Sequence, residues 1–261
     1  MDRTPFLYRT VMEFFKNLGR KIRTFTARYG YACECCGVEL FEYPQPRFCD
    51  ACERKLHDND GVTCVKCGRM AITNGVCLNC KSRAPRFTQG FSAFVYDGEV
   101  AALINRFKNG KRRLAYILAE RMAEDLVQKA KGLDGEEPLF IVPVPTTKEQ
   151  RAKRGYNQAE ELALALAEQL SERGFAVETA EEVLQKTRDT AQQKHLGHVA
   201  RAENVKGAYH VHKRKFCQGK TILLVDDIMT TGATGDECAR LLKSAGAKAV
   251  YFIVAASLPE T

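Results

Sequence analysis

Two adjacent carboxylates, Asp226 and Asp227, directly follow an apolar run, and a short loop of threonine and glycine comes after them. The run 222–225 predicts a strand that is buried on both faces, as in a parallel sheet. The acids then lie at the carboxyl end of this strand, where open α/β sheets bind ligands. Backbone N–H groups and hydroxyls of the loop, at the start of a predicted helix, favour an anion. Paired acids beside such a loop suit a ligand that carries ribose hydroxyls and a phosphate.

A plain strand–turn–helix is the alternative interpretation of this stretch, with a threonine as helix cap and Gly232 in the turn. It explains the turn, but it leaves two acids against a buried strand, where an unpaired charge is costly. We therefore favour a ligand site.

The thirteen residues 222–234 resemble the phosphoribosyl pyrophosphate (PRPP) motif of type I phosphoribosyltransferases. The resemblance implies that Asp226 and Asp227 hold the ribose hydroxyls, directly or through Mg²⁺, and makes them the candidate catalytic residues. It assigns the 5-phosphate to the residues of the following loop, which are Thr230, Thr231, Gly232, Ala233 and Thr234.

The composition indicates a folded protein. The chain has 261 residues, of which 45% are hydrophobic, enough for a core and too many for a disordered chain. No apolar stretch approaches the ~20 residues that span a bilayer, and the basic N-terminus lacks the apolar core of a signal peptide. We therefore expect a cytoplasmic location.

Nine of the eleven cysteines lie between Cys33 and Cys80, mostly in C-x-x-C pairs. In a cytosolic protein this pattern indicates metal rather than disulfides. Two C-x-x-C turns direct four sulfurs at one ion and complete a tetrahedral Zn–S₄ site, which has no open position for catalysis. We predict two structural zinc ions. Their ligands are Cys33, Cys36, Cys49 and Cys52 in one set, and Cys64, Cys67, Cys77 and Cys80 in the other.

Alternatives to this arrangement stay open. Consecutive pairs are the simplest partners, but the pairs can also cross, and Cys35 can replace a neighbouring ligand. A redox C-x-x-C is disfavoured because such motifs normally follow a strand of a thioredoxin-like unit. Two zinc sites would change the formal net charge of +8 to about +4, since an ion with four thiolates carries about −2. Binding of nucleic acid therefore has to rest on local clusters.

One such cluster combines five cations with one aromatic ring and no acid. Its members are Arg106, Phe107, Lys108, Lys111, Arg112 and Arg113. Cations near an aromatic ring suit single-stranded nucleic acid, through phosphate neutralisation and base stacking. The alternative is a solvated helix end with Phe107 in the core. A second basic region, 185–220, is predicted to be a mobile lid over the ligand or part of a DNA surface.

The elements that position these residues alternate along the chain. Strands are predicted at 91–96, 139–144, 176–184, 221–225 and 249–254, and helices at 99–108, 112–131, 157–173 and 234–244. This alternation argues for a parallel α/β sheet. Residues 1–30 predict a basic amphipathic helix, which can lie on an anionic membrane, dock a partner or pack on the neighbouring module. We expect three parts: this helix, a cysteine module at 31–85 and an α/β domain at 86–261.

With both the cysteine pairs and the PRPP-like motif, the chain resembles the ComF family of bacterial competence-associated proteins. Stretches that agree with the family are Arg106–Gly110, Ile141–Pro145, Arg154–Gln158 and Arg201–Ala208. The resemblance implies a double zinc ribbon followed by a type I phosphoribosyltransferase-like parallel sheet flanked by helices.

It also implies a pyrophosphate loop after the strand 139–144, formed by Val144, Pro145 and Thr146, whose amides can face the anion. Arg154 supplies charge there because it belongs to a family-like segment. Lys148 and Lys153 fit a solvated helix start equally well.

The resemblance favours a PRPP-binding competence protein that acts in DNA uptake and natural transformation. Such a protein would handle single-stranded DNA at the cytoplasmic side of the inner membrane, with other competence proteins as partners. The alternative is an active phosphoribosyltransferase of nucleotide metabolism, which moves phosphoribosyl from PRPP with Mg²⁺ to a base or amine. A sensor that uses PRPP only as a ligand is a third hypothesis. No residues that read a base are recognisable.

Overall fold

The computed structural model describes residues 32–41, 47–130, 133, 137–188 and 205–260, and the chain divides into two compact units. The first unit ends at Glu53 and the second begins at Arg54. The boundary falls inside the range 31–85, so the two sets of cysteines belong to different units. The helix predicted at 1–30 and the segment 189–204 of the predicted lid lie outside the described residues.

The described part of the first unit is small. It contains the helix α2 (Asp50–Glu53) and an antiparallel bridge between Ala32 and Glu39. Five cysteines, four of them predicted metal ligands, lie on these short pieces of backbone, which carry little regular structure of their own.

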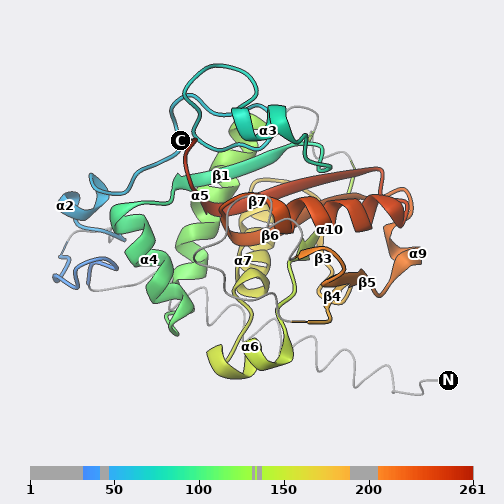
Figure 1. The fold of residues 1–261 in the computed structure, drawn as a ribbon. Coiled ribbons are helices and arrows are strands. Elements are labelled where there is room, and N and C mark those ends of the chain that lie inside the picture. Colours follow the sequence, from blue (N-terminus) through green and yellow to red (C-terminus); the bar gives the residue numbers. More distant parts are fainter. Residues whose placement is uncertain (1–31, 42–46, 131–132, 134–136, 189–204, 261) are drawn as a thin grey trace. The chain divides into compact units, whose positions relative to one another are not determined.

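A five-stranded parallel sheet is the centre of the second unit (Figure 1). Its strands are β1 (Gly90–Val95), β2 (Leu139–Pro143), β3 (Val177–Thr179), β6 (Thr221–Met229) and β7 (Ala249–Ser257). They lie in the order β1-β7-β6-β2-β3, and all four neighbouring pairs are parallel. The predicted fold class is thus confirmed.

Helices cover both faces of this sheet. The long helices are α4 (Gly98–Lys108), α5 (Leu114–Lys129), α7 (Gln158–Glu172) and α10 (Ala233–Ser244), and the short ones are α3 (Leu78–Ser82), α6 (Lys148–Arg154) and α9 (Arg214–Cys217). Helices α5 and α7 pack on each other and on the strands, while α10 packs on β6 and β7. No helix in the described ranges is both long and apolar enough for a transmembrane span.

Side chains that alternate along the strands divide the core between the two faces. Ile222 and Leu224 of β6 share one cluster with Phe252 of β7 and Leu242 of α10. Gly235 lets α10 lie close to β7, because a Cβ at this position would come within 2.4 Å of the Phe252 ring. The start of α10 is therefore fixed against the sheet.

Three local features differ from the sequence-based expectation. Strand β6 continues to Met229, because β7 pairs with it as far as Ser257, whereas β2 stops at the pair Pro143–Val225. The strand predicted at 176–184 is divided, because β3 ends at Thr179 and the next strand begins only at Leu184. The region predicted as a lid begins in a two-stranded antiparallel sheet, β4 (Leu184–Lys186) with β5 (Tyr209–Val211), and it also contains α9.

Candidate functional site

A cavity of about 180 Å³ beside the end of β2 and the second half of β6 brings together residues from most of the predicted ligand segments. Its predicted members are Asp226, Asp227, Thr234, Val144, Pro145, Thr146 and Arg154. Lys108, Gln150, Asn157, Gln158, Ala159, Lys186 and Tyr209 complete the lining. A larger cavity of about 450 Å³ lies between the second set of cysteines and the loop 231–233, and the paired acids do not line it.

The two acids point to opposite sides of β6, as neighbouring strand residues do, and their surroundings differ. Asp227 forms an ion pair with Lys108, whose Nζ lies 3.0 Å from its Oδ2. Asp226 accepts a hydrogen bond from the backbone N–H of Asp227 at 2.9 Å. Burial, and then the negative charge of Asp227, raise the pKa of Asp226 to about 7, although Lys108 and Lys186 oppose this shift. Asp226 can therefore gain or lose a proton near neutral pH.

The loop 230–234 has the backbone of an anion site. Gly232 adopts φ 82° just before α10, a conformation that glycine reaches without strain. The first N–H groups of a helix lack partners within the helix and carry a partial positive charge. Thr234 lines the cavity of the paired acids, whereas Thr231, Gly232 and Ala233 line the larger one. The Thr230 carbonyl accepts a hydrogen bond from Arg69 at 2.9 Å.

The predicted pyrophosphate loop follows β2 and is held from both sides. The Val144 N–H donates to the Val225 carbonyl at 2.8 Å, and its own carbonyl accepts from Asn157 Nδ2 at 3.1 Å. Asn157 also caps α7, because its Oδ1 accepts from the Ala159 N–H at 3.2 Å. Thr147 caps α6 in the same way. Two caps and a strand pair thus fix the backbone that would face the anion.

Cations on α6 divide between the cavity and the solvent. Arg154 lines the cavity and donates to Gln158 Oε1 at 3.1 Å. The Nε2 of Gln158 is buried and has no hydrogen-bond partner among the described residues. It is a donor that a ligand oxygen could satisfy. Lys148 and Lys153 are exposed on α6, in agreement with the alternative that they belong to a solvated helix start.

Lys186 and Tyr209 belong to this site although the sequence analysis did not single them out. The β4–β5 pair places them side by side, with Lys186 Nζ 5.6 Å from the centre of the Tyr209 ring. Burial raises the pKa of Tyr209, and the negative charge of Asp226 adds to this shift. Their only signal in the sequence is membership of a basic region, because the contact depends on two short strands far apart in the chain.

The six residues predicted to bind nucleic acid differ in burial and in the partners they contact. Phe107 is fully buried and packs on Tyr156, with ring centres 5.9 Å apart, so it occupies the core position that was its alternative. Arg112 stacks on the same tyrosine at 4.5 Å and donates to the Gly155 carbonyl at 2.6 Å. Lys108 faces Asp227. Arg106 is half-buried, and Lys111 and Arg113 are exposed.

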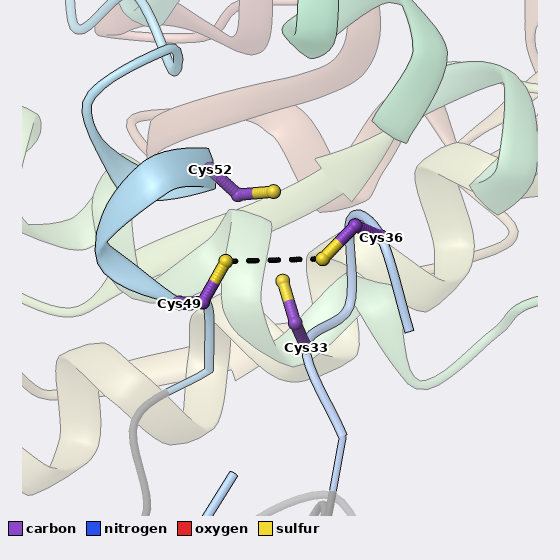
Figure 2. A group of neighbouring side chains, drawn as sticks. All are labelled: Cys33, Cys36, Cys49 and Cys52. Carbon is purple, nitrogen blue, oxygen red and sulfur yellow. Dashed lines mark hydrogen bonds between the residues drawn. The ribbon is translucent and has the colours of Figure 1, made fainter. Parts of the chain in front are cut away.

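The eight predicted metal ligands form two groups of four in the consecutive pairing. Within each group the sulfur atoms all lie within 4.8 Å of one another, and Figure 2 shows those of Cys33, Cys36, Cys49 and Cys52 converging. The Cys36 and Cys49 sulfurs are 3.8 Å apart, and in the second group those of Cys67 and Cys77 are 3.7 Å apart.

These distances fit a tetrahedral metal site. Zn–S bonds of about 2.3 Å give a tetrahedron with edges of roughly 3.8 Å. Both groups can therefore hold a metal ion, and the donor set is compatible with zinc. Cys35 is not a member of either group; its N–H donates to the Cys33 sulfur at 3.4 Å.

The chain is similar to known proteins over most of its length. A family model described as the phosphoribosyl transferase domain matches residues 110–261. The DNA utilization protein YhgH of Salmonella typhimurium is 29% identical over 204 residues, which cover 77% of this chain and 86% of that protein. Competence protein F of Haemophilus influenzae is 28% identical over 206 residues, with coverage of 77% and 86%.

Among solved structures, the glutamine PRPP amidotransferase from B. subtilis, complexed with ADP and GMP, aligns with a TM-score of 0.34 and 19% identity. The alignment covers 55% of this chain and only 26% of that one.

Proposed function

This chain belongs to the phosphoribosyl transferase domain family and is a relative of the ComF-type competence proteins, and from this membership we propose that it binds PRPP. One observation carries the proposal. The cavity of about 180 Å³ collects acids of β6, the segment after β2 and Arg154 of α6, three parts of the chain that were predicted separately. Their chemistry matches ribose hydroxyls and a pyrophosphate.

In the proposed complex, Asp226 and Asp227 hold the ribose hydroxyls, directly or through Mg²⁺. The start of α10 holds the 5-phosphate, and the amides after β2 face the pyrophosphate with Arg154 and Gln158 beside them. Mg²⁺ would supply positive charge between the acids and the pyrophosphate. In the free protein, Lys108 already forms an ion pair with Asp227. The charged side chains of the site would therefore be positioned before the ligand and its Mg²⁺ enter.

Calorimetric titration with PRPP and Mg²⁺ tests this proposal. The wild-type chain should bind, and Asp227→Asn should weaken binding by about tenfold or more, because a charged group in a hydrogen bond contributes roughly 1.5–3 kcal/mol. Glu181→Gln is the matched control, since Glu181 is exposed and does not line the cavity. Absence of binding by the wild-type chain at millimolar PRPP would refute the proposal.

The same protein decides whether PRPP is a ligand or a substrate. Pyrophosphate release is measured with PRPP, Mg²⁺ and a panel of bases and amines. Release that depends on one of these acceptors would favour an active phosphoribosyltransferase. Binding without release would favour the competence role, in which PRPP acts as a ligand.

We further propose zinc as the ion in both groups of cysteines. Four thiolates in a closed tetrahedral site favour this ion. Metal analysis by mass spectrometry should find about two zinc ions per wild-type chain, and about one in Cys36→Ser and in Cys77→Ser. Iron in place of zinc would contradict the assignment.

The cellular role that we propose is the handling of single-stranded DNA during uptake, at the cytoplasmic side of the inner membrane and together with other competence proteins. Its support is the similarity to Competence protein F and to the DNA utilization protein. Lys111 and Arg113 are exposed at the end of the basic cluster and are the cations we assign to DNA phosphates.

A further inference from the structure

The second group of cysteines is built into the same core as the helix of the phosphate loop. Cys64, Cys67, Cys77 and Cys80 share one buried cluster with Phe252 of β7 and Leu242 of α10. The contact with the sheet is close: a Cβ on Gly68 would come within 2.4 Å of the Gly90 carbonyl oxygen at the start of β1. The metal group and the loop 230–234 are therefore parts of one packed body.

Arg69 connects the two directly. Its backbone carbonyl accepts from the Cys64 N–H at 2.9 Å, so the residue forms part of the metal-binding turn. The residue is 2% exposed, and its Nη2 donates to the Thr230 carbonyl at 2.9 Å. A buried guanidinium that ends on a loop carbonyl is a costly arrangement, since its Nε has no partner among the described residues. The hydrogen bond to Thr230 is therefore the main polar contact that this buried side chain makes with the phosphate loop.

The bond to Arg69 sets the direction of one peptide group in the phosphate loop. In a trans peptide the carbonyl and the next N–H point to opposite sides. With the Thr230 oxygen held by Arg69, the Thr231 N–H points away from the guanidinium. An anion needs loop N–H groups turned toward it and carbonyls turned away, so a cation that holds the carbonyl favours the binding conformation of the loop.

Further hydrogen bonds hold the residues at both ends of the loop. Asp236, in the first turn of α10, accepts from the Arg86 N–H at 2.6 Å and from the Arg86 side chain at 2.9 Å, and Arg83 adds a bond of 3.3 Å. These cations compensate an acid that would otherwise repel a phosphate at the helix start. At the other end of the loop, the Met229 carbonyl accepts from the Leu258 N–H at 3.0 Å.

The C-terminal segment completes this connection. The Glu260 carboxylate accepts from the N–H groups of Leu78 at 2.6 Å and Ile72 at 3.0 Å, both within the metal-binding segment. The segment after β7 thus joins the end of β6 to the second group of cysteines.

We propose that Arg69 is a positioning residue of the phosphate loop, and that the second group of cysteines acts as a support for the PRPP site and not only as a staple of the fold. The metal turn fixes Arg69, and Arg69 fixes the Thr230–Thr231 peptide. The effect on affinity rests on the proposed binding of PRPP, whereas the effect on the loop conformation does not.

The test uses Arg69→Met, which keeps the length of the side chain and removes the guanidinium. Hydrogen exchange followed by mass spectrometry should show faster exchange at 230–234 in the ligand-free variant, with unchanged exchange at 221–225. Calorimetry should show PRPP binding weakened by about tenfold to hundredfold, the range expected for a lost charge-assisted bond. For Arg69→Lys, loop exchange and PRPP affinity should lie between those of the wild type and those of Arg69→Met. The lysine ammonium can still donate a hydrogen bond, but it lacks the planar guanidinium fork.

Hydrogen exchange, compared with thermal unfolding, separates positioning from a general structural role. Arg69 interacts with the charge of Cys67, so its removal should cost some stability, and positioning is shown by faster exchange at 230–234 while exchange at 221–225 stays at the wild-type level. Arg173→Met is the control, since the Arg173 side chain bonds to Gln169 and lies outside the phosphate loop; the PRPP affinity of this variant should equal that of the wild type. Zinc content is measured for every variant.

Wild-type exchange and wild-type affinity in Arg69→Met would overturn the proposal. If that variant loses zinc or fails to fold, Arg69→Lys carries the test, because it keeps the charge beside the thiolates. Affinity of the lysine variant equal to wild type, with unchanged loop exchange, would then overturn it. If the wild-type chain does not bind PRPP, the proposed function fails, and the exchange measurement still decides the role of Arg69.

Discussion

Asp226 and Asp227 are neighbours in the sequence, yet their environments prepare them for different protonation behaviour. Asp227 has a cation at 3.0 Å, Lys108 Nζ. Burial raises the pKa values of Cys238 and Tyr209, and the nearby charge of Asp226 raises both further. The side-chain alternation of a strand is what separates them. A ligand with several negative charges therefore meets one acid that is neutralised by an ion pair and one that can be neutralised by a proton.

The pKa of Asp226 predicts a dependence of stability on pH. It is about 7 in the folded chain, against an ordinary value of 3.8. Between about pH 4 and pH 7 the folded state therefore binds more protons than the unfolded state, so the free energy of unfolding falls as the pH rises. Asp226→Asn has no carboxyl group at this position, so its free energy of unfolding should not fall for this reason. Its stability relative to the wild type, measured by urea denaturation, should increase from pH 5 to pH 8.

The exposed acid Glu181 supplies the control for this measurement. Glu181→Gln should change stability by the same small amount at both pH values. A difference between Asp226→Asn and the wild type that stays constant from pH 5 to pH 8 would show that Asp226 is already ionised throughout this range.

Among the elements, α10 depends most visibly on one residue. Alanine normally stabilises a helix relative to glycine by about 1 kcal/mol. At Gly235 we expect alanine to destabilise the protein instead, because the added Cβ would come within 2.4 Å of the Phe252 ring. We expect Gly235→Ala to lower the free energy of unfolding by about 1–3 kcal/mol, the cost of overpacking a core. PRPP binding should weaken as well, since the start of α10 has to move.

Gly61→Ala is the control for added side-chain volume, at a glycine outside the described helices. The nearest atom to a Cβ at Gly61 is the Met70 Cε at 3.6 Å, an ordinary contact. Chemical denaturation should show little change in this variant. Wild-type stability in Gly235→Ala would mean that α10 can shift on β7 without cost.

The same elements mark the limit of prediction from the sequence. The apolar run of β6 and the acids after it are local patterns, so the strand and the ligand residues were predictable together. The end of β6 was not, because it depends on how far β7 pairs with it. Lys186 and Tyr209 enter the site through three-residue strands, whose pairing partner no local pattern indicates. Arg69 follows a metal-binding turn, and its target, Thr230, is far along the chain.

At the scale of the whole molecule, the proposed ligand and the proposed nucleic acid use different parts of one basic cluster. Phe107 and Arg112 contribute to packing around Tyr156, and Lys108 belongs to the acids of the cavity. Lys111 and Arg113 are exposed and carry no part of the cavity lining. Binding of DNA and binding of PRPP should therefore be separable by substitution.

Salt dependence measures this separation. Each phosphate that a protein neutralises on a single strand adds about 0.7 to the slope of log affinity against log salt concentration. The double variant Lys111→Ala/Arg113→Ala should thus reduce the magnitude of the slope by about 1.4, with calorimetric PRPP affinity unchanged. Fluorescence anisotropy with a labelled oligothymidylate between about 50 and 200 mM salt provides the slope.

Lys55→Ala/Lys243→Ala is the matched control, because it removes the same charge from two exposed lysines that lie outside both basic regions of the chain. If only the general charge of the chain attracts DNA, both double variants should lower the slope equally, and the basic cluster then has no special part. If the cluster is the contact, the control keeps nearly the wild-type slope, since exposed charges farther apart than a Debye length of about 8–10 Å are largely screened. A wild-type slope close to zero would remove phosphate recognition from the proposed role altogether.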